Sequence, residues 1–172
     1  MFSSSHPIRI GGTTPTELRA LLEEAQVMLN PMAEQLFADP RFTVRQESSL
    51  VEVVTGPAAG LGFQDGATFE QLVAQASRYG LTLCPLELAP HFRLQFTEQA
   101  EASTSEPPAR HQAPPGSVTV ASAPPTDEQD IPWGFYLRRI EGRLWLRGYR
   151  SWSGHVWAPR DEFAFIRAHN AD

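Results

Sequence analysis

Apolar residues near the start of the chain recur at the spacing of an amphipathic helix, with Leu18 and Leu22 on one face. Thr14 stands three residues before Glu17, so the two side chains can form a capping box where a helix begins. The pattern therefore predicts a helix over residues 15–29.

A second, shorter helix is predicted directly after the first. Asn30 is followed by Pro31, a pair that ends one helix and begins the next, and the second helix is predicted over 31–37. From residue 42 onward the apolar side chains alternate with polar ones instead. This change of period predicts strands over 42–46 and 50–54, paired with each other.

The capping-box spacing returns in the middle of the chain, at Thr68 and Gln71. The apolar stripe that follows it predicts a central amphipathic helix over 68–79. Two short runs after this helix, 81–84 and 92–96, have the alternation and composition of strands and are predicted as such.

The clearest pattern is a β-hairpin near the C-terminus. Residues 135–140 and 143–150 flank Glu141-Gly142, a two-residue connection typical of tight hairpin turns. Because side chains alternate across a strand, the hairpin has two faces. The apolar face, expected in the core, carries Phe135, Leu137, Leu144 and Leu146. The opposite face carries Tyr136, Arg138, Arg143, Trp145, Arg147 and Tyr149. A last strand is predicted over 162–167.

A proline-rich stretch interrupts these elements. Seven of the fifteen prolines fall in 99–132, together with Ser, Thr, Ala and Glu, a composition that disfavours an ordered block. A β-branched run at 117–121 is a strand candidate within it. We therefore predict a disordered insertion over 99–116 inside an α+β core spanning 41–172, preceded by an N-terminal helical segment over 1–40.

Together these patterns predict an α+β fold in a single domain. The expected architecture is a small, largely antiparallel sheet with an N-terminal helical pair and one central helix. A chain of 172 residues is long enough to bury a core of its own without disulfide bonds.

The charges are unevenly distributed along the chain. The net charge is −6, and all fourteen basic residues are arginine. Seven of them lie within 138–167 against three acidic residues, which gives that segment a local charge of +4. All four tryptophans also lie in the last third. The surface is thus expected to be dipolar, with an acidic body and a basic, aromatic C-terminal part. The overall negative charge argues against indiscriminate nucleic-acid binding.

The polar face of the hairpin, with Trp152 and Trp157, is the candidate binding surface. The two tryptophans bracket a short Ser-Gly-His loop, where packing alone does not require large rings. Arginine and aromatic residues dominate protein interface hot spots, and Arg138 opposite Trp145 is expected to form a cation–π contact. We therefore expect a protein partner. Single-stranded nucleic acid is the alternative, because bases stack on rings with ~1–3 kcal/mol each.

Catalytic chemistry has one weak candidate. Cys84, Glu87 and His91 lie within eight residues, and a neighbouring base could activate the thiol as a nucleophile. The alternative is a buried cysteine that acts as a small hydrophobic residue. No metal-ligand spacing, phosphate loop or Gly-x-Ser-x-Gly motif is present. We expect a non-catalytic protein without metal or cofactor.

Localisation is predicted to be cytosolic. The single cysteine favours a reducing compartment, and no apolar run approaches the ~20 residues of a membrane span. The first residues also lack the basic and apolar regions of a signal peptide. No contact with a membrane is expected.

Three stretches, Leu61-Gly62-Phe63, Gly80 to Glu87 and Trp157 to Phe163, resemble a group of small uncharacterised bacterial proteins. The resemblance covers about residues 61–167. In that group the segment that matches 95–120 is shorter, which implies that the proline-rich stretch is an insertion within one domain. The resemblance implies no activity, so it assigns no functional residues.

Overall fold

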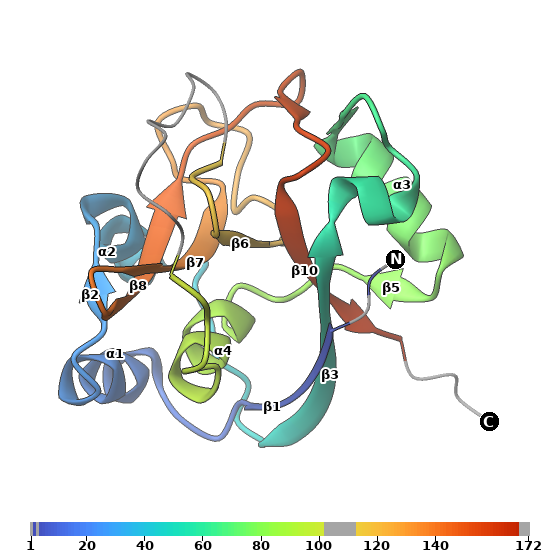
Figure 1. Ribbon diagram of the computed structural model, residues 1–172. Helices are drawn as coiled ribbons and strands as arrows, with labels where there is room; N and C mark the ends of the chain where they lie inside the picture. The colour runs from blue at the N-terminus through green and yellow to red at the C-terminus, as the bar shows by residue number, and fades with distance from the viewer. Residues whose placement is uncertain (1, 3, 102–112, 169–172) are drawn as a thin grey trace.

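A mixed sheet of eight strands, curled into a half-barrel, is the frame of the molecule (Figure 1). The computed structural model describes residue 2 and residues 4–101 and 113–168. Within them the strand order is β1-β3-β10-β6-β7-β8-β2, and β5 also pairs with β10. The strands of this sheet are β1 (Ser4–Ile10), β2 (Met28–Leu29), β3 (Ser49–Pro57), β5 (Leu81–Thr82), β6 (Val118–Val120), β7 (Gly134–Ile140), β8 (Arg143–Tyr149) and β10 (Glu162–Arg167).

Helices and a small second sheet complete the described part of the α+β domain. The helices are α1 (Pro15–Glu24), α2 (Pro31–Ala38), α3 (Phe69–Arg78), α4 (Leu88–Gln95) and the 3-10 helix η1 (Ala58–Leu61). The second sheet pairs β4 (Ala67–Thr68) with β9 (Val156–Trp157). In the large sheet β10 runs parallel to β6 and β2 parallel to β8, while the other pairs are antiparallel. The sheet is thus largely antiparallel, as predicted, but with eight strands it is not the small sheet that we expected.

Helix α4 lies against the concave, inner face of the sheet. Its Leu88 and Phe92 are fully buried in a core with Ile10 of β1, Leu137 of β7 and Leu146 of β8. The helix contacts β1 near one end of the sheet and β8 near the other, so the sheet curves around it (Figure 1). Helices α1 and α2 extend the same layer.

Helix α3 and η1 cover part of the convex, outer face. Phe163 and Phe165 of β10 pack there in a second core with Leu72 of α3 and Leu61 of η1. Ala164, between the two phenylalanines, belongs to the inner core instead. This split follows from the alternation of side chains along a strand. Both helix N-termini with a predicted capping box, those of α1 and α3, have one.

The first helix is shorter than predicted, because it ends at Glu24 and the chain then forms β2. Gln26 adopts the left-handed conformation, with φ 58°. Its N–H donates to the carbonyl of Glu23, and the N–H of Val27 donates to the carbonyl of Leu22. These two bonds form a Schellman motif, which usually contains glycine at the position of Gln26. The sequence therefore lacks the usual signal for this helix end.

Two predicted strands are absent from the structure. Residues 42–46 form a loop whose Arg45 backbone binds Gly12, which follows β1, and the Glu87 side chain, which precedes α4. Strand β3 pairs instead with β1, a strand that the sequence pattern missed. Residues 92–96 lie mostly in α4. Pro90 is compatible with that helix because it lies in the first turn, where its missing N–H needs no partner.

Amide side chains bind the backbone at both edges of the large sheet. On β1, Gln95 of α4 donates to the carbonyl of Arg9 at 2.7 Å and accepts from its N–H at 2.9 Å. On β8, beyond the two residues of β2, Asn30 donates to the carbonyl of Gly148 at 2.9 Å and accepts from its N–H at 2.8 Å. Each side chain thus takes the place of a neighbouring strand.

The ends of the predicted insertion, 99–101 and 113–116, are among the described residues, and its middle, 102–112, lies outside them. Gln99 is buried and donates to the carbonyls of Gly116 and Leu137. The strand candidate at 117–121 is confirmed as β6. Among the described residues, the helices are too short or too polar to cross a membrane.

Candidate binding site

The hairpin that carries the candidate residues forms in the predicted register. Arg138 lies opposite Trp145 and Tyr136 opposite Arg147. The turn residues Glu141 and Gly142 have φ values of 50° and 73°. Two positive φ values in a two-residue connection match the right-handed twist of the strands. The predicted apolar face is confirmed as part of the inner core, so the polar face belongs to the outer side of the sheet.

Five of the eight predicted binding residues line one pocket on the outer face, with a cavity volume of about 360 Å³. They are Tyr136, Arg147, Tyr149, Trp152 and Trp157. We call this cavity the outer-face pocket. Its other walls come from distant parts of the sequence: Asn30, Met32, Ala113, Pro114, Thr119, Gly148, Arg150, Ser151 and His155.

The remaining three predicted residues lie outside this pocket. Arg138 and Trp145 are half-buried on the same face of the hairpin. Arg143, next to the hairpin turn, is exposed and lines a different cavity. The eight residues therefore share one hairpin and the loop after it, and five of them converge on one site.

Aromatic rings form a continuous cluster along the pocket. The ring centroids of Trp152 and His155 are 5.1 Å apart, and those of His155 and Trp157 are 4.7 Å apart. Trp157 meets Tyr149 at 5.7 Å with an interplanar angle of 88°, and Tyr149 lies 6.3 Å from Tyr136. Neighbouring rings in this series are tilted or perpendicular. Such edge-to-face contacts stabilise the cluster beyond its buried area.

Trp157 is more deeply buried than the sequence suggested. It is 4 % exposed and packs on Phe163 in the second core. The pairing of β9 with β4 places Trp157 opposite Ala67, which is itself part of that core. The interpretation that packing does not require this ring is therefore wrong. Trp152, in contrast, is 49 % exposed, so it presents a large ring to the solvent at the rim of the pocket.

Arg147 connects the pocket with Trp145. Its guanidinium carbon lies 5.2 Å from the ring centroid of Trp145 and 5.9 Å from that of Tyr136. These are cation–π distances. The cation that lies over Trp145 is thus that of Arg147, two residues along the same strand, and not that of Arg138, which we predicted from the cross-strand pairing.

Several polar atoms of pocket residues are buried without a hydrogen bond. Of nine such side-chain atoms in the described part of the chain, four belong to residues that line the outer-face pocket: Arg147 Nε, Tyr149 Oη, Ser151 Oγ and Trp157 Nε1. All four can donate a hydrogen bond. Burial also raises the pKa of the Tyr149 hydroxyl well above its usual value, so it keeps its proton. Buried donors without acceptors are rare in folded proteins and call for a cause.

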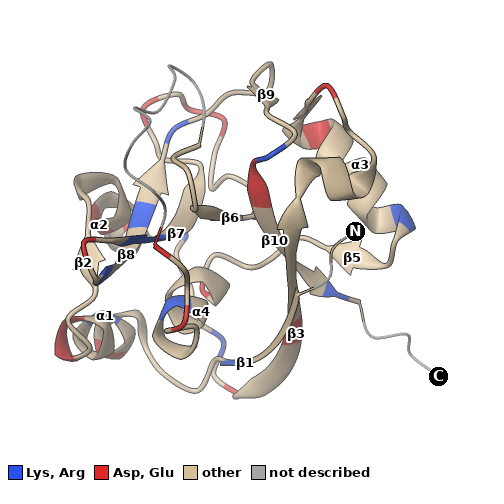
Figure 2. Ribbon diagram, in the orientation of Figure 1, with Lys and Arg blue, Asp and Glu red and all other residues tan. Residues whose placement is uncertain are grey.

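The hairpin arginines, by which we mean Arg138, Arg143, Arg147 and Arg150, form no ion pair with any carboxylate that the structure describes. Figure 2 shows the basic residues of β7 and β8 on the side of the molecule away from α3. Arg150 donates to the backbone carbonyl of Asp130, and Arg143 lies 3.9 Å from the sulfur of Met28. This face therefore carries uncompensated positive charge.

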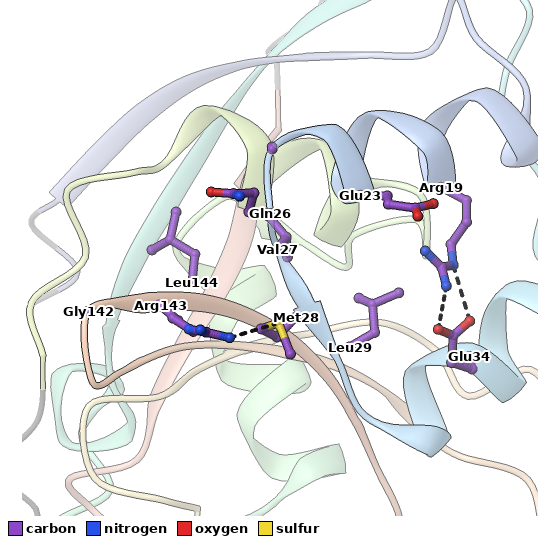
Figure 3. Close-up of a pocket in the computed structure, with 11 residues that line it drawn as sticks. Arg19, Glu23, Gln26, Val27, Met28, Leu29, Glu34, Gly142, Arg143 and Leu144 are labelled. Carbon is purple, nitrogen blue, oxygen red and sulfur yellow. Dashed lines mark hydrogen bonds and ion pairs between the residues drawn. The ribbon is translucent and has the colours of Figure 1, made fainter.

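A larger cavity, of about 610 Å³, lies between the end of α1, β2 and the hairpin turn (Figure 3). Arg19 and Glu34 point toward each other across it, and the guanidinium donates to both carboxylate oxygens. The positive charge of Arg19 and the negative charge of Glu34 thus partly neutralise each other in this cavity. The outer-face pocket differs because its arginines have no such partner.

The thiol candidate does not form a nucleophilic site. Cys84 is buried, and burial raises the pKa of its thiol well above the usual range. Its sulfur donates to the carbonyl of Ala164 at 3.5 Å. His91 is occupied elsewhere, because its Nε2 accepts a hydrogen bond from the N–H of Gly11 at 3.1 Å and lies 3.8 Å from Glu87. The described geometry therefore matches the alternative interpretation, a cysteine that packs as a small hydrophobic residue.

The described ranges contain no cluster of three or more His, Cys, Asp or Glu side chains suited to hold an ion. Comparison with protein-family models, curated proteins and solved structures returns no match for this chain. The resemblance of residues 61–167 to small bacterial proteins stays a prediction.

Sequence reasoning missed the walls of the pocket outside the hairpin. Asn30 had a signal as a helix cap, but nothing local indicated that it would also reach Gly148. Pro114 belonged to a stretch predicted as disordered. His155 stands between the two tryptophans in the sequence, and that spacing could have marked it as a member of the ring cluster.

Proposed function

We propose that this is a non-catalytic binding protein, of an accessory or regulatory kind found in the bacterial cytosol, that captures a protein partner through the outer-face pocket. The observation that carries the proposal is the convergence of Tyr149, Trp152 and Trp157 with Arg147 on one concave site. Tryptophan, tyrosine and arginine at the centre of a pocket are the usual anchors of protein interfaces. The free, buried thiol of Cys84 supports a reducing compartment.

The pocket is ready to bind without large rearrangement. Its walls are β-strands, the N-terminal end of α2, the loop after β8 and the segment at 113–114. The bonds between Asn30 and Gly148 and the ring cluster hold the first three together. Rigid aromatic anchors lose little conformational entropy on binding. The positive charge of the hairpin arginines favours a partner whose contact surface is acidic.

Photo-crosslinking tests the proposal. A photoreactive phenylalanine analogue at position 152 should crosslink to a host protein, whereas the same analogue at position 79 should not. Tyr79 is also an exposed aromatic residue, 59 % accessible, but lies at the end of α3. The absence of any product specific to position 152 would overturn the proposal.

The protein identified in this way is then purified for affinity measurements. The double variant Arg147→Ser/Trp152→Ala should weaken its binding by at least about tenfold, the loss typical of hot-spot residues. The matched control Arg78→Ser/Tyr79→Ala removes an exposed arginine and an exposed ring from α3 and should leave the affinity unchanged. Equal affinities of the two double variants would contradict the assignment of the site.

Single-stranded nucleic acid remains the second candidate, and the unpaired hairpin arginines are the observation that favours it. The ring cluster favours it less, because Trp157 and Tyr136 are 4 % and 9 % exposed and cannot offer a free face to a base. Binding of an oligonucleotide would weaken steeply between low and moderate salt. No binding at low salt would exclude this function.

A further inference from the structure

A cavity of about 700 Å³ lies on the concave, inner face of the large sheet, beside the C-terminal end of α4. It is lined by His6 of β1, Thr55 of β3 and Glu162 of β10, together with Phe96, the residue that follows α4. Each of the three strand residues lies two positions from a residue of the inner core, so the alternation of side chains places it on the inner face. We call this space the inner-face cavity. Its volume is in the range of small-molecule sites, roughly 300–1,000 Å³.

Carboxylates dominate the charge of the inner-face cavity. Asp161, directly before β10, and Glu162, its first residue, line the cavity against one arginine, Arg160. Neither carboxylate forms an ion pair with a side chain that the structure describes. His6 does not compensate them, because burial lowers its pKa and leaves the ring neutral near pH 7. The cavity therefore favours a cation.

Asp161 is held in place and has no paired cation. It is 4 % exposed, and its Oδ2 accepts a hydrogen bond from the N–H of Ala158 at 2.8 Å. Burial raises the pKa of Asp161, and this effect outweighs the opposite effects of the Ala158 bond and of Arg160. A carboxylate that has lost its water without gaining a partner is stabilised when a cation binds beside it.

A buried hydroxyl faces the same cavity. Thr55 is 8 % exposed, and its hydroxyl forms no hydrogen bond with any described residue. Buried polar groups almost always have a partner, so an unpartnered hydroxyl in a cavity wall indicates a ligand group. Its oxygen also does not belong to the sealed atoms of the molecule, unlike the unpaired donors of the outer-face pocket. A ligand in the inner-face cavity can therefore reach it.

This set of groups fits an organic ammonium ion better than a metal ion. A metal ion requires a cluster of several ligands, and the described residues contain none. A primary ammonium group has three N–H donors, and the carboxylates of Asp161 and Glu162 and the Thr55 hydroxyl are acceptors. Phe96 and Val118 supply apolar wall for a carbon chain. Glu162 is exposed, so the cavity is accessible from the solvent.

We propose that the inner-face cavity binds a small ligand that carries a primary ammonium group on an apolar carbon chain. The ammonium group lies against Asp161, Glu162 and Thr55, and the carbon chain lies along Phe96. This inference goes beyond the proposed function, because it assigns a second site. Among the described residues, the inner-face cavity and the outer-face pocket share only Ala113 and Pro114.

Three probes with the same carbon chain test the inference on the full-length protein. They are hexylamine, 1-hexanol and hexanoate, which carry a positive, a neutral and a negative terminal group at pH 7. Nuclear magnetic resonance titration gives the affinities, and the imidazole signals of His6 report on the cavity. We expect hexylamine to bind at least about tenfold more tightly than 1-hexanol, and hexanoate to bind most weakly.

A fourth probe identifies the source of the ammonium group. Nα-acetyl-lysine methylamide carries the same group on a peptide unit. Tighter binding of this probe than of hexylamine would indicate a lysine of another protein, and weaker binding would indicate a free amine. Both results support an ammonium site.

Two variants remove the proposed contacts without a large change of shape. Thr55→Val deletes only the unpartnered hydroxyl, so it should leave the stability to urea unchanged and weaken hexylamine binding several-fold. Glu162→Gln should weaken binding by about tenfold, because an ionised acceptor is lost. The matched control Glu70→Gln removes an exposed carboxylate from α3, outside the cavity, and should not change the affinity. If Thr55→Val does not fold, Glu162→Gln carries the test alone, since its side chain is exposed.

Other results would overturn the inference. They are equal binding of hexylamine and 1-hexanol, tighter binding of hexanoate, no binding of hexylamine at millimolar concentrations, or an unchanged affinity in both Thr55→Val and Glu162→Gln. The proposed function is tested separately, because Arg147→Ser/Trp152→Ala should bind hexylamine as the parent protein does. Loss of hexylamine binding in that double variant alone would place the amine in the outer-face pocket and would also overturn the inference.

Discussion

The side chain of Asn30 makes two hydrogen bonds to the backbone of Gly148, 118 residues further along the chain. The same side-chain oxygen also accepts from the N–H of Ala33 and thereby caps α2. One residue thus joins the start of a helix to the outermost strands of the sheet and fixes one wall of the outer-face pocket.

Replacement of Asn30 by alanine should lower the free energy of unfolding by roughly 2–3 kcal/mol, because the helix cap and the two bonds to Gly148 are all lost. Urea unfolding measures the change. Asn30→Asp keeps the acceptor for Ala33 and Gly148 but loses the donor, so it should lie between the parent and Asn30→Ala. A fully stable Asn30→Ala variant would show that these bonds contribute little.

Arg93 is fully buried and forms no described ion pair with a carboxylate. Its guanidinium donates to the side chain of Gln99 at 2.6 Å, to the carbonyl of Phe96 and to that of Trp145 at 3.5 Å. Burial, with a smaller contribution from nearby Arg139, lowers its pKa to about 10. The cation therefore ties α4 and the segment after it to β8.

Arg93→Met retains an apolar side chain but leaves these acceptors without a donor, and we expect a loss of roughly 2–4 kcal/mol in the free energy of unfolding. Arg93→Lys should rescue little of it, since one ammonium group cannot reach acceptors spread around a planar guanidinium. Denaturant titration of the parent protein and the two variants measures these differences in the free energy of unfolding. Parent-like stability of Arg93→Met would refute the role of these bonds.

His91 should make the stability of the protein depend on pH. Burial lowers the pKa of His91 below 6.5, which outweighs the opposite effect of Glu87. A histidine with a lowered pKa in the folded state stabilises the protein fully above the pKa of the unfolded state and loses that contribution as the pH falls. We therefore expect the melting temperature to fall between about pH 7 and pH 5. Protonation would also cost the bond from Gly11.

The variant His91→Gln cannot titrate in this range, so its melting temperature should change less over the same interval. His6 contributes a second part, because burial lowers its pKa as well. Comparison of the variants His91→Gln and His6→Gln shows how much of the pH dependence of the melting temperature each histidine contributes. An unchanged pH dependence in His91→Gln would assign the effect to other groups.

The thiol of Cys84 should be inert in the folded protein. It is buried beneath β10, and its raised pKa leaves almost no thiolate at neutral pH. Iodoacetamide at pH 8 should modify it slowly under native conditions and rapidly in urea, as measured by mass spectrometry. Rapid native modification, comparable to that of free cysteine, would instead revive the hypothesis of a thiol enzyme.

Local signals predicted the parts of the fold that depend on neighbouring residues. The Glu141-Gly142 turn set the register of β7 and β8, and the capping boxes at Thr14 and Thr68 placed the start of two helices. The helix end at Gln26 was missed because glycine, the usual signal, is absent there.

Long-range contacts explain the rest of the difference between prediction and structure. The period of 92–96 fits a strand as well as a helix, and only packing against both ends of the sheet selects α4. Strand β1 begins with serines and contains Pro7, and it is stabilised by pairing with β3, whose residues lie 39 to 51 positions further along the chain. The outer-face pocket was predictable in its hairpin half, while its walls at Asn30 and Pro114 arise from tertiary structure.

The amide side chains at the two borders of the large sheet also limit how another molecule can attach. An unpaired strand is a template onto which a foreign strand can be added. Gln95 occupies that position beside Arg9, and Asn30 does so beside Gly148. A foreign strand could pair with these edges only after it had displaced the Gln95 or Asn30 side chain. A partner is therefore better recognised through its side chains, on the convex face that carries the aromatic rings and the arginines.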